Sequence, residues 1–103
     1  MEDGSPAPLV CIRTVQIPPG NETAFYAWIG SNRELRQRYG ILMERILSPA
    51  DGQGDWIIIT MWESEQAFER WLVAPEKPAL DASPSHALVT FGKIKRYATV
   101  SGY

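Results

Sequence analysis

The sequence has few of the residues that form covalent or metal crosslinks. Its 103 residues include one cysteine, Cys11, and one histidine, His86. A single cysteine excludes an intrachain disulfide, and this usage fits a reduced, cytoplasmic setting. One cysteine and one histidine also exclude a closed structural zinc site within a single chain. We therefore expect no metal site.

Excess charge and long apolar runs are missing as well. The chain has 10 Lys+Arg against 12 Asp+Glu, a formal net charge of -2. This balance gives no electrostatic reason to expect nucleic acid or an anionic membrane as a partner. No apolar run approaches the roughly 20 residues that a membrane-spanning helix requires, and the acidic, polar start lacks the layout of a signal peptide. We expect a cytoplasmic protein without nucleic-acid or membrane partners.

The apolar residues that are present, 45% of the chain, suffice for one folded domain. Residues 1–8 predict a flexible tail and residues 9–103 a single domain. Segments rich in β-branched residues and bounded by turn residues predict four strands: 9–17, 41–48, 56–62 and 87–100. Gly92, inside the last segment, predicts a bulge or bend.

Apolar residues at spacings of three and four predict two helices. The first covers residues 22–39 with Asn21 as its N-cap, and the second follows Ser64, also an N-cap candidate. Pro78 can begin a further short turn, because proline is tolerated at the first helical position. The order β-α-β-β-α-β predicts an α+β, ferredoxin-like fold with an antiparallel sheet and both helices on one face.

The third predicted strand indicates how the other face of the sheet is covered. Residues 57–59 read Ile-Ile-Ile, which places large apolar side chains on both faces. Large exposed apolar patches are rare on monomers, and a second copy packed sheet to sheet around a two-fold axis would cover this one. The pattern therefore predicts a homodimer.

Several short motifs carry a resemblance to a known family. They are Pro19-Gly20 after the first strand, Phe25 in the first helix, Ser48-Pro49-Ala50-Asp51 in the hairpin, and WESEQAFERW at residues 62–71. With these motifs the chain, from Val10 to Tyr97, resembles the antibiotic biosynthesis monooxygenase (ABM) domain family of the dimeric α+β barrel superfamily. The resemblance implies a homodimer in which two sheets form a barrel, with an apolar cavity between helices and sheet in each subunit. It identifies the fold better than the reaction. Members include cofactor-free oxygenases of aromatic polyketides and quinols and haem-degrading oxygenases, and relatives in the superfamily are polyketide cyclases or isomerases.

The resemblance allows haem degradation to be weighed residue by residue. In haem-degrading members a histidine ten residues after the second-helix tryptophan ligates the iron. Counting ten from Trp71 gives Asp81, and His86 lies five residues further on. Those members also have an asparagine in the first strand, where this chain has Ile12-Arg13-Thr14. Because a carboxylate is an unusual axial ligand for haem iron, haem degradation is the less favoured expectation.

Cofactor-independent oxygenation makes modest demands: an aromatic-lined pocket, a base, and a donor for a developing oxyanion. The expected catalytic residues are Asn32, His86 and Arg13, with His86 the best available general base. The expected substrate-binding residues are aromatic: Phe25, Trp28, Tyr39, Trp62, Phe68 and Trp71. The predicted function is a monooxygenase that acts with molecular oxygen on an aromatic polyketide- or quinol-like small molecule. A polyketide cyclase or isomerase and a non-catalytic small-molecule binding protein remain the alternatives.

Each catalytic candidate also has a structural interpretation. Asn32 can simply hydrogen-bond a nearby backbone group. Arg13 alternates with apolar neighbours and can point to solvent or to the rim of the dimer interface. His86 lies in a stretch with loop composition, where a surface histidine is the default.

Overall fold

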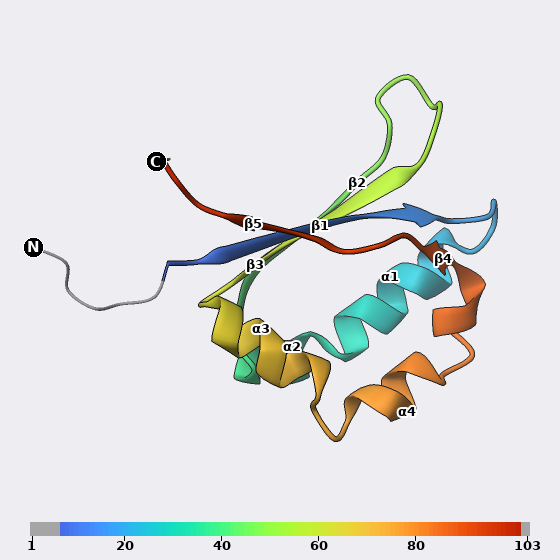
Figure 1. Ribbon diagram of the computed structural model, residues 1–103. Coiled ribbons are helices and arrows are strands. Elements are labelled where there is room, and N and C mark those ends of the chain that lie inside the picture. The colour runs from blue at the N-terminus through green and yellow to red at the C-terminus, as the bar shows by residue number, and fades with distance from the viewer. Residues whose placement is uncertain (1–6, 102–103) are drawn as a thin grey trace, which may run out of the picture.

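The computed structural model describes residues 7–101, which form one antiparallel sheet with helices packed on one of its faces (Figure 1). This is the α+β, ferredoxin-like fold that the sequence predicts. The predicted tail at residues 1–8 lies largely outside the described residues. In chain order the elements are β1 (Leu9–Gln16), α1 (Glu22–Ser31), α2 (Arg33–Arg38), β2 (Ile41–Leu47), β3 (Trp56–Trp62), α3 (Glu65–Leu72), α4 (Lys77–Asp81), the short 3-10 helix η1 (His86–Leu88), β4 (Thr90–Phe91) and β5 (Lys95–Ala98).

The sheet is built around β1. Its strand order is β2-β3-β1-β4, and β5 also pairs with β1. Along the antiparallel β1–β3 ladder, Cys11 lies opposite Thr60 and Arg13 opposite Ile58. Because side chains alternate between faces, Arg13 shares the helix-covered face with Cys11 and with the fully buried Val15.

The first predicted helix is interrupted, which corrects the expectation of one helix over residues 22–39. Its two parts, α1 and α2, meet at Asn32, whose backbone is not helical (φ -113°, ψ 13°). The side-chain Nδ2 of Asn32 donates to the carbonyl of Trp28 at 2.9 Å. Asparagine side chains compete with helical hydrogen bonds in this way, which favours a break. Asn21 does not cap α1 with its side chain; its Nδ2 donates instead to the Leu88 carbonyl at 2.8 Å.

The second predicted helix, α3, begins as expected. The hydroxyl oxygen of Ser64 accepts a hydrogen bond from the backbone N–H of Ala67 at 3.0 Å. This satisfies one of the free donors at the helix start and is worth about 1 kcal/mol. Phe68 and Trp71 then fall on the buried face. The expected short turn at Pro78 is α4, with proline in its first turn.

The last predicted strand, 87–100, is wrong in extent. The chain forms η1, the two-residue strand β4, and then β5, with a break after Phe91. Gly92 lies at this break, as its bend prediction requires. Its N–H donates to the Thr14 carbonyl at 2.8 Å, and a Cβ placed on it would lie 2.1 Å from the Thr14 hydroxyl oxygen. A larger residue at this position would have to displace the Thr14 side chain.

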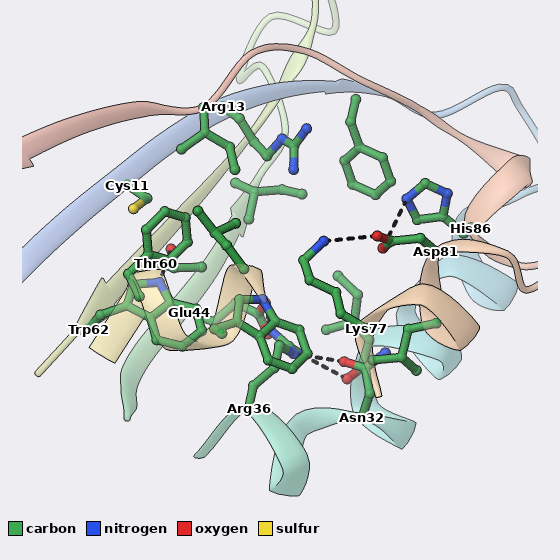
Figure 2. Close-up of a pocket in the computed structure, with 18 of the residues that line it drawn as sticks. Cys11, Arg13, Asn32, Arg36, Glu44, Thr60, Trp62, Lys77, Asp81 and His86 are labelled. Atoms are coloured by element: carbon green, nitrogen blue, oxygen red, sulfur yellow. Dashed lines mark hydrogen bonds and ion pairs between the residues drawn. The ribbon is translucent and has the colours of Figure 1, made fainter. Parts of the chain in front are cut away.

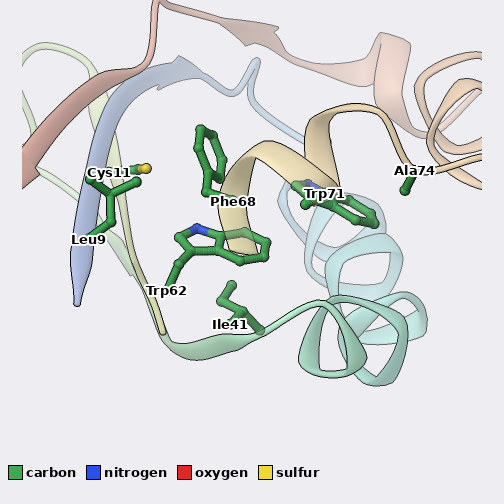
Figure 3. Close-up of a cluster of buried hydrophobic side chains, with 7 residues drawn as sticks. All are labelled: Leu9, Cys11, Ile41, Trp62, Phe68, Trp71 and Ala74. Atoms are coloured by element: carbon green, nitrogen blue, oxygen red, sulfur yellow. The ribbon is translucent and has the colours of Figure 1, made fainter. Parts of the chain in front are cut away.

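Two apolar clusters fill the space between sheet and helices. One lies beneath α3, where the rings of Trp62 and Trp71 stack at 6.2 Å (Figure 3). The other lies beneath α1 and centres on Phe25, Ile29 and Val15. The cavity described below is lined by members of both clusters.

The opposite face of the sheet is apolar and open. Helices α1 to α4 all lie on one side (Figure 1), and the pairs Val10–Met61 and Ile12–Ile59 point to the other. Tyr97, opposite Val10 on β5, is 47% exposed. Within residues 7–101, nothing covers this face. No helix in that range is long and apolar enough to cross a membrane.

Candidate functional site

A cavity of about 140 Å³ lies between the sheet and the helices (Figure 2). Its wall combines aliphatic side chains from the core with aromatic and polar ones. The aromatic residues are Trp28, Trp62, Phe68, Trp71 and Phe91. The polar residues with charge or hydrogen-bonding capacity are Arg13, Asn32, Arg36, Glu44, Thr60, Lys77, Asp81 and His86.

Arg13 reaches this cavity from β1 and is half-buried. Its Nε and Nη2 donate to the Gly92 carbonyl at 3.0 and 2.7 Å, and its guanidinium carbon lies 4.6 Å from the centre of the Phe91 ring. Burial lowers the pKa of Arg13, and the negative charge of Asp81 acts in the opposite direction. Arg13 therefore lies in the cavity wall and not in solvent.

His86 also lines the cavity, beside α4. Its ring contacts Phe91 at 4.8 Å and meets Trp28 edge-on at 5.5 Å. Its Nε2 lies 3.9 Å from a carboxylate oxygen of Asp81, whose other oxygen accepts a hydrogen bond from Lys77 at 2.9 Å. The predicted surface histidine is thus one of three ionisable side chains at the same part of the cavity.

A second polar cluster, buried more deeply, consists of Asn32, Arg36 and Glu44. Arg36 donates from Nε to Asn32 Oδ1 at 2.7 Å, from Nη2 to the Ile29 carbonyl at 2.9 Å, and from Nη1 to the Glu44 carboxylate. Both ends of the Asn32 amide are therefore engaged within the chain. The expected backbone hydrogen bond of Asn32 is present, and Asn32 also lines the cavity.

Sequence reasoning missed Arg36 and Glu44 as cavity residues. The spacing of four between Asn32 and Arg36 was the available signal, since residues four apart on a helix face each other. No such signal exists for Glu44. The β2 ladder shifts register between Ile41 and Met43, so Ile41 and Glu44 share the helix-covered face although three residues separate them.

Four of the six expected substrate-binding residues line the cavity: Trp28, Trp62, Phe68 and Trp71. Phe25 and Tyr39 do not. Phe25 is fully buried beneath α1, and Tyr39 packs against the outer side of Trp71 with its hydroxyl donating to Glu76 at 2.9 Å. That hydrogen bond raises the pKa of Tyr39. Trp28 carries a further feature: its indole N–H is buried without an acceptor among the described residues.

Comparison with known proteins identifies the family. The family model for antibiotic biosynthesis monooxygenase, ABM, matches residues 8–77. The chain belongs to the ABM family.

Two curated relatives and many solved structures resemble this ABM domain. The relatives, from two strains of Mycobacterium tuberculosis, carry the name heme oxygenase (mycobilin-producing). Each is 27% identical over 90 residues, which cover 77% of this chain and 73% of the relative. The solved structure of SnoaB, a cofactor-independent oxygenase from Streptomyces nogalater, superposes with a TM-score of 0.74 at 16% sequence identity. The superposition covers 93% of this chain and 96% of the SnoaB chain. The structure of the heme-degrader MhuD from M. tuberculosis, with two hemes bound in its active site, superposes with a TM-score of 0.71 at 21% sequence identity. This superposition covers 92% of this chain and 98% of the MhuD chain.

The cavity of this ABM domain does not fit haem as it stands. Its volume of about 140 Å³ is close to the roughly 150 Å³ cavity that holds one benzene molecule and below the ~300–1,000 Å³ of drug-sized sites. A porphyrin is several times larger than one ring. His86 is directed at Asp81 and packed between Trp28 and Phe91.

Proposed function

We propose that this ABM-family protein is a cofactor-independent monooxygenase that oxidises a small phenol or quinol with molecular oxygen. One observation carries the proposal: an aromatic-lined cavity whose wall holds an imidazole and a guanidinium that both contact the Phe91 ring. Such a reaction needs an apolar site that excludes water, a base, and a donor for the oxygen anion. The ABM family membership agrees with oxygenase chemistry.

The proposed reaction follows from the chemistry of phenols. Loss of the phenolic proton gives an electron-rich anion that can pass an electron to O₂. The resulting radical pair combines at a ring carbon, and loss of water leaves a quinone. One oxygen atom of O₂ enters the product and the other leaves as water, while the phenol supplies all the electrons. The protein then has to hold the ring, move one proton and stabilise one negative oxygen.

Each lining residue has a place in this proposal. His86 takes the proton, because its imidazole lines the cavity and imidazole is the side chain that most often serves as a general base. Arg13 faces the oxygen anion. Asn32, whose amide donates to Trp28 and accepts from Arg36, acts as a positioning residue that holds Arg36 at the cavity wall. The four tryptophan and phenylalanine side chains from the predicted set, Trp28, Trp62, Phe68 and Trp71, hold the ring of the substrate.

The protein is proposed to work as a homodimer. A second copy would cover the open sheet face, which includes Ile12 and Ile59. Light scattering should then give twice the 11.6 kDa chain mass, and Ile59→Lys should give the mass of a single chain. A single-chain mass for the unaltered protein would contradict the dimer.

The central test measures oxygen consumption with a panel of phenols, naphthols and quinols, using isotopically labelled dioxygen to follow the incorporated atom. His86→Gln should lower kcat by roughly 10²–10⁴-fold, the usual worth of a general base. Tyr39→Phe, which lies outside the cavity, is the matched control and should change kcat little.

The alternatives give different results in the same assay. Turnover that persists without oxygen would replace the oxygenase by a cyclase or isomerase. Tight binding without turnover would indicate a binding protein. Haem added as a substrate in the same assay tests the activity for which the M. tuberculosis relatives are named, haem oxygenation. A strong shift of the haem absorption band followed by its loss under reductant would favour haem degradation over the proposal.

A further inference from the structure

We infer that the cavity selects a phenol with a single ring and binds it as the phenolate anion. The ionised oxygen of the ligand lies beside Arg13, at the end of the cavity where Phe91 is located. The inference narrows the substrate class of the proposed oxygenase and rests on that proposed function for its biological meaning. It rests on the size of the cavity, on the charges that face it, and on the hydrogen-bond donors left without acceptors.

The size of the cavity limits the ligand to one ring. A volume of about 140 Å³ matches that of a cavity known to take benzene. Rings from both core clusters form the wall, with Trp62 and Trp71 stacked at 6.2 Å and Phe68 packed on Trp62 at 5.3 Å. Because packed cores resist expansion, a second fused ring would force these side chains apart.

The charges differ between the two arginines that line the cavity. Arg36 has a carboxylate partner in the chain, Glu44. Arg13 forms no ion pair within 4.0 Å among residues 7–101, although it is half-buried and its burial disfavours the charged form. A buried charge is stabilised by an opposite charge nearby. Asp81 acts on Arg13 from beyond 4.0 Å, and a ligand anion in the cavity would supply a closer partner.

The remaining charges around Arg13 leave a positive excess. Lys77 and Asp81 on α4 pair with each other at 2.9 Å, so they nearly cancel. His86 on η1 lies beside them and carries a positive charge only when protonated. Figure 2 shows Arg13 extending from the sheet and Lys77 from α4 toward the same cavity. The cavity end that contains Arg13 therefore carries about one unit of uncompensated positive charge.

Two donors at this end have no acceptor. Arg13 uses Nε and Nη2 for the Gly92 carbonyl, and its Nη1 makes no hydrogen bond within the described residues. The indole N–H of Trp28 is buried without an acceptor there, and the Trp28 ring lies 6.5 Å from Phe91. The Trp28 N–H is closed off by burial, whereas Arg13 Nη1 is not among the fully buried donors without a partner. Arg13 Nη1 is therefore the donor that a ligand oxygen in the cavity can reach.

The test uses two probes of nearly equal size, para-nitrophenol and nitrobenzene, with binding followed by quenching of tryptophan fluorescence. The ionised nitrophenol also absorbs visible light, so its protonation state is read directly. The unaltered protein should bind nitrophenolate at least roughly tenfold more tightly than nitrobenzene, since a partly buried charge pair is worth on the order of 1–3 pKa units. Bound nitrophenol should therefore ionise about 1 pH unit or more below the free compound. Para-phenylphenol, with a second ring, should bind at least about tenfold more weakly than nitrophenol.

Three variants separate charge from structure. Arg13→Gln should weaken nitrophenolate about tenfold and change nitrobenzene less than about twofold. Arg13→Lys keeps the charge but loses the paired hydrogen bonds to Gly92, and it should keep most of the preference for the anion. Arg45→Gln, which removes an exposed arginine from strand β2 at the edge of the same sheet, should leave both probes unchanged. If Arg13→Gln fails to fold, the Lys variant and the ionisation shift in the unaltered protein decide.

Any of three results would overturn the inference. They are equal affinity for nitrophenolate and nitrobenzene, equal weakening of both probes by Arg13→Gln, and tight binding of para-phenylphenol. Its failure can be told from failure of the oxygenase. If the protein binds nitrophenolate selectively but consumes no oxygen with any phenol, the anion site is supported and the proposed oxygenase activity is refuted. Normal phenol oxidation by Arg13→Gln would leave the oxygenase and remove the anion site.

Discussion

The pair formed by Arg36 and Glu44 allows a stability prediction worked from the structure. The two side chains are only 10% and 12% exposed, and Arg36 makes two further hydrogen bonds, to Asn32 Oδ1 and to the Ile29 carbonyl. Arg36→Met keeps much of the side-chain length and apolar packing but leaves the Glu44 carboxylate facing the cavity unpaired. Removing one partner of a buried pair costs about 3–5 kcal/mol. A domain of this size has about 5–15 kcal/mol of stability in total, so a large fraction would be lost.

Urea unfolding followed by tryptophan fluorescence measures this loss, at one fixed protomer concentration because a dimer makes stability concentration-dependent. The melting temperature should fall by on the order of 12 °C or more, at roughly 4–8 °C per kcal/mol. Arg33→Met, at an exposed position of the same helix α2, is the matched control and should stay within ~0.5 kcal/mol.

A double variant shows whether the cost comes from the stranded charge. Combining Arg36→Met with Glu44→Leu should recover most of the loss, because apolar replacement of a whole buried pair is often neutral or stabilising by about 1–4 kcal/mol. A loss below about 1 kcal/mol for Arg36→Met, or a double variant no more stable than the single one, would refute the reasoning.

Three further predictions test local features. Gly92→Ala should lower the free energy of unfolding by about 1–3 kcal/mol, because the new Cβ would overlap the Thr14 hydroxyl. Gly30→Ala, on the open surface of helix α1, should instead raise it by about 0.5–1 kcal/mol. Equal effects of the two substitutions in urea unfolding would contradict this prediction. Ser64→Ala should cost about 1 kcal/mol through loss of the cap on α3, and an unchanged unfolding midpoint would argue against that cap. Cys11 is buried, and burial raises the pKa of its thiol. Iodoacetamide should therefore modify Cys11 at least roughly tenfold more slowly in the native protein than in urea at the same pH. Equal modification rates would disprove the burial of Cys11.

Local chemistry explains what the sequence by itself determined. The ferredoxin-like order of elements follows from residue periodicity, and the start of α3 follows from Ser64, whose hydroxyl satisfies a free N–H one turn later. The bend at Gly92 was likewise predicted from residue type. The block around Trp62 and Trp71 indicated the ABM family, which the family match shows. The cap at Ser64 is an interaction between residues close together in the chain, whereas Gly92 also contacts Thr14, which is distant in sequence.

Other features were decided only by the tertiary structure. The inward direction of Glu44 depends on a register shift of β2 against β3. Arg13 could have pointed either way until the β1–β3 register placed it on the helix-covered face. Which face a side chain occupies is set by pairing between strands distant in sequence, and one residue of slippage reverses it. The size and charge of the cavity, and with them the substrate class that we infer, depend on the same long-range register.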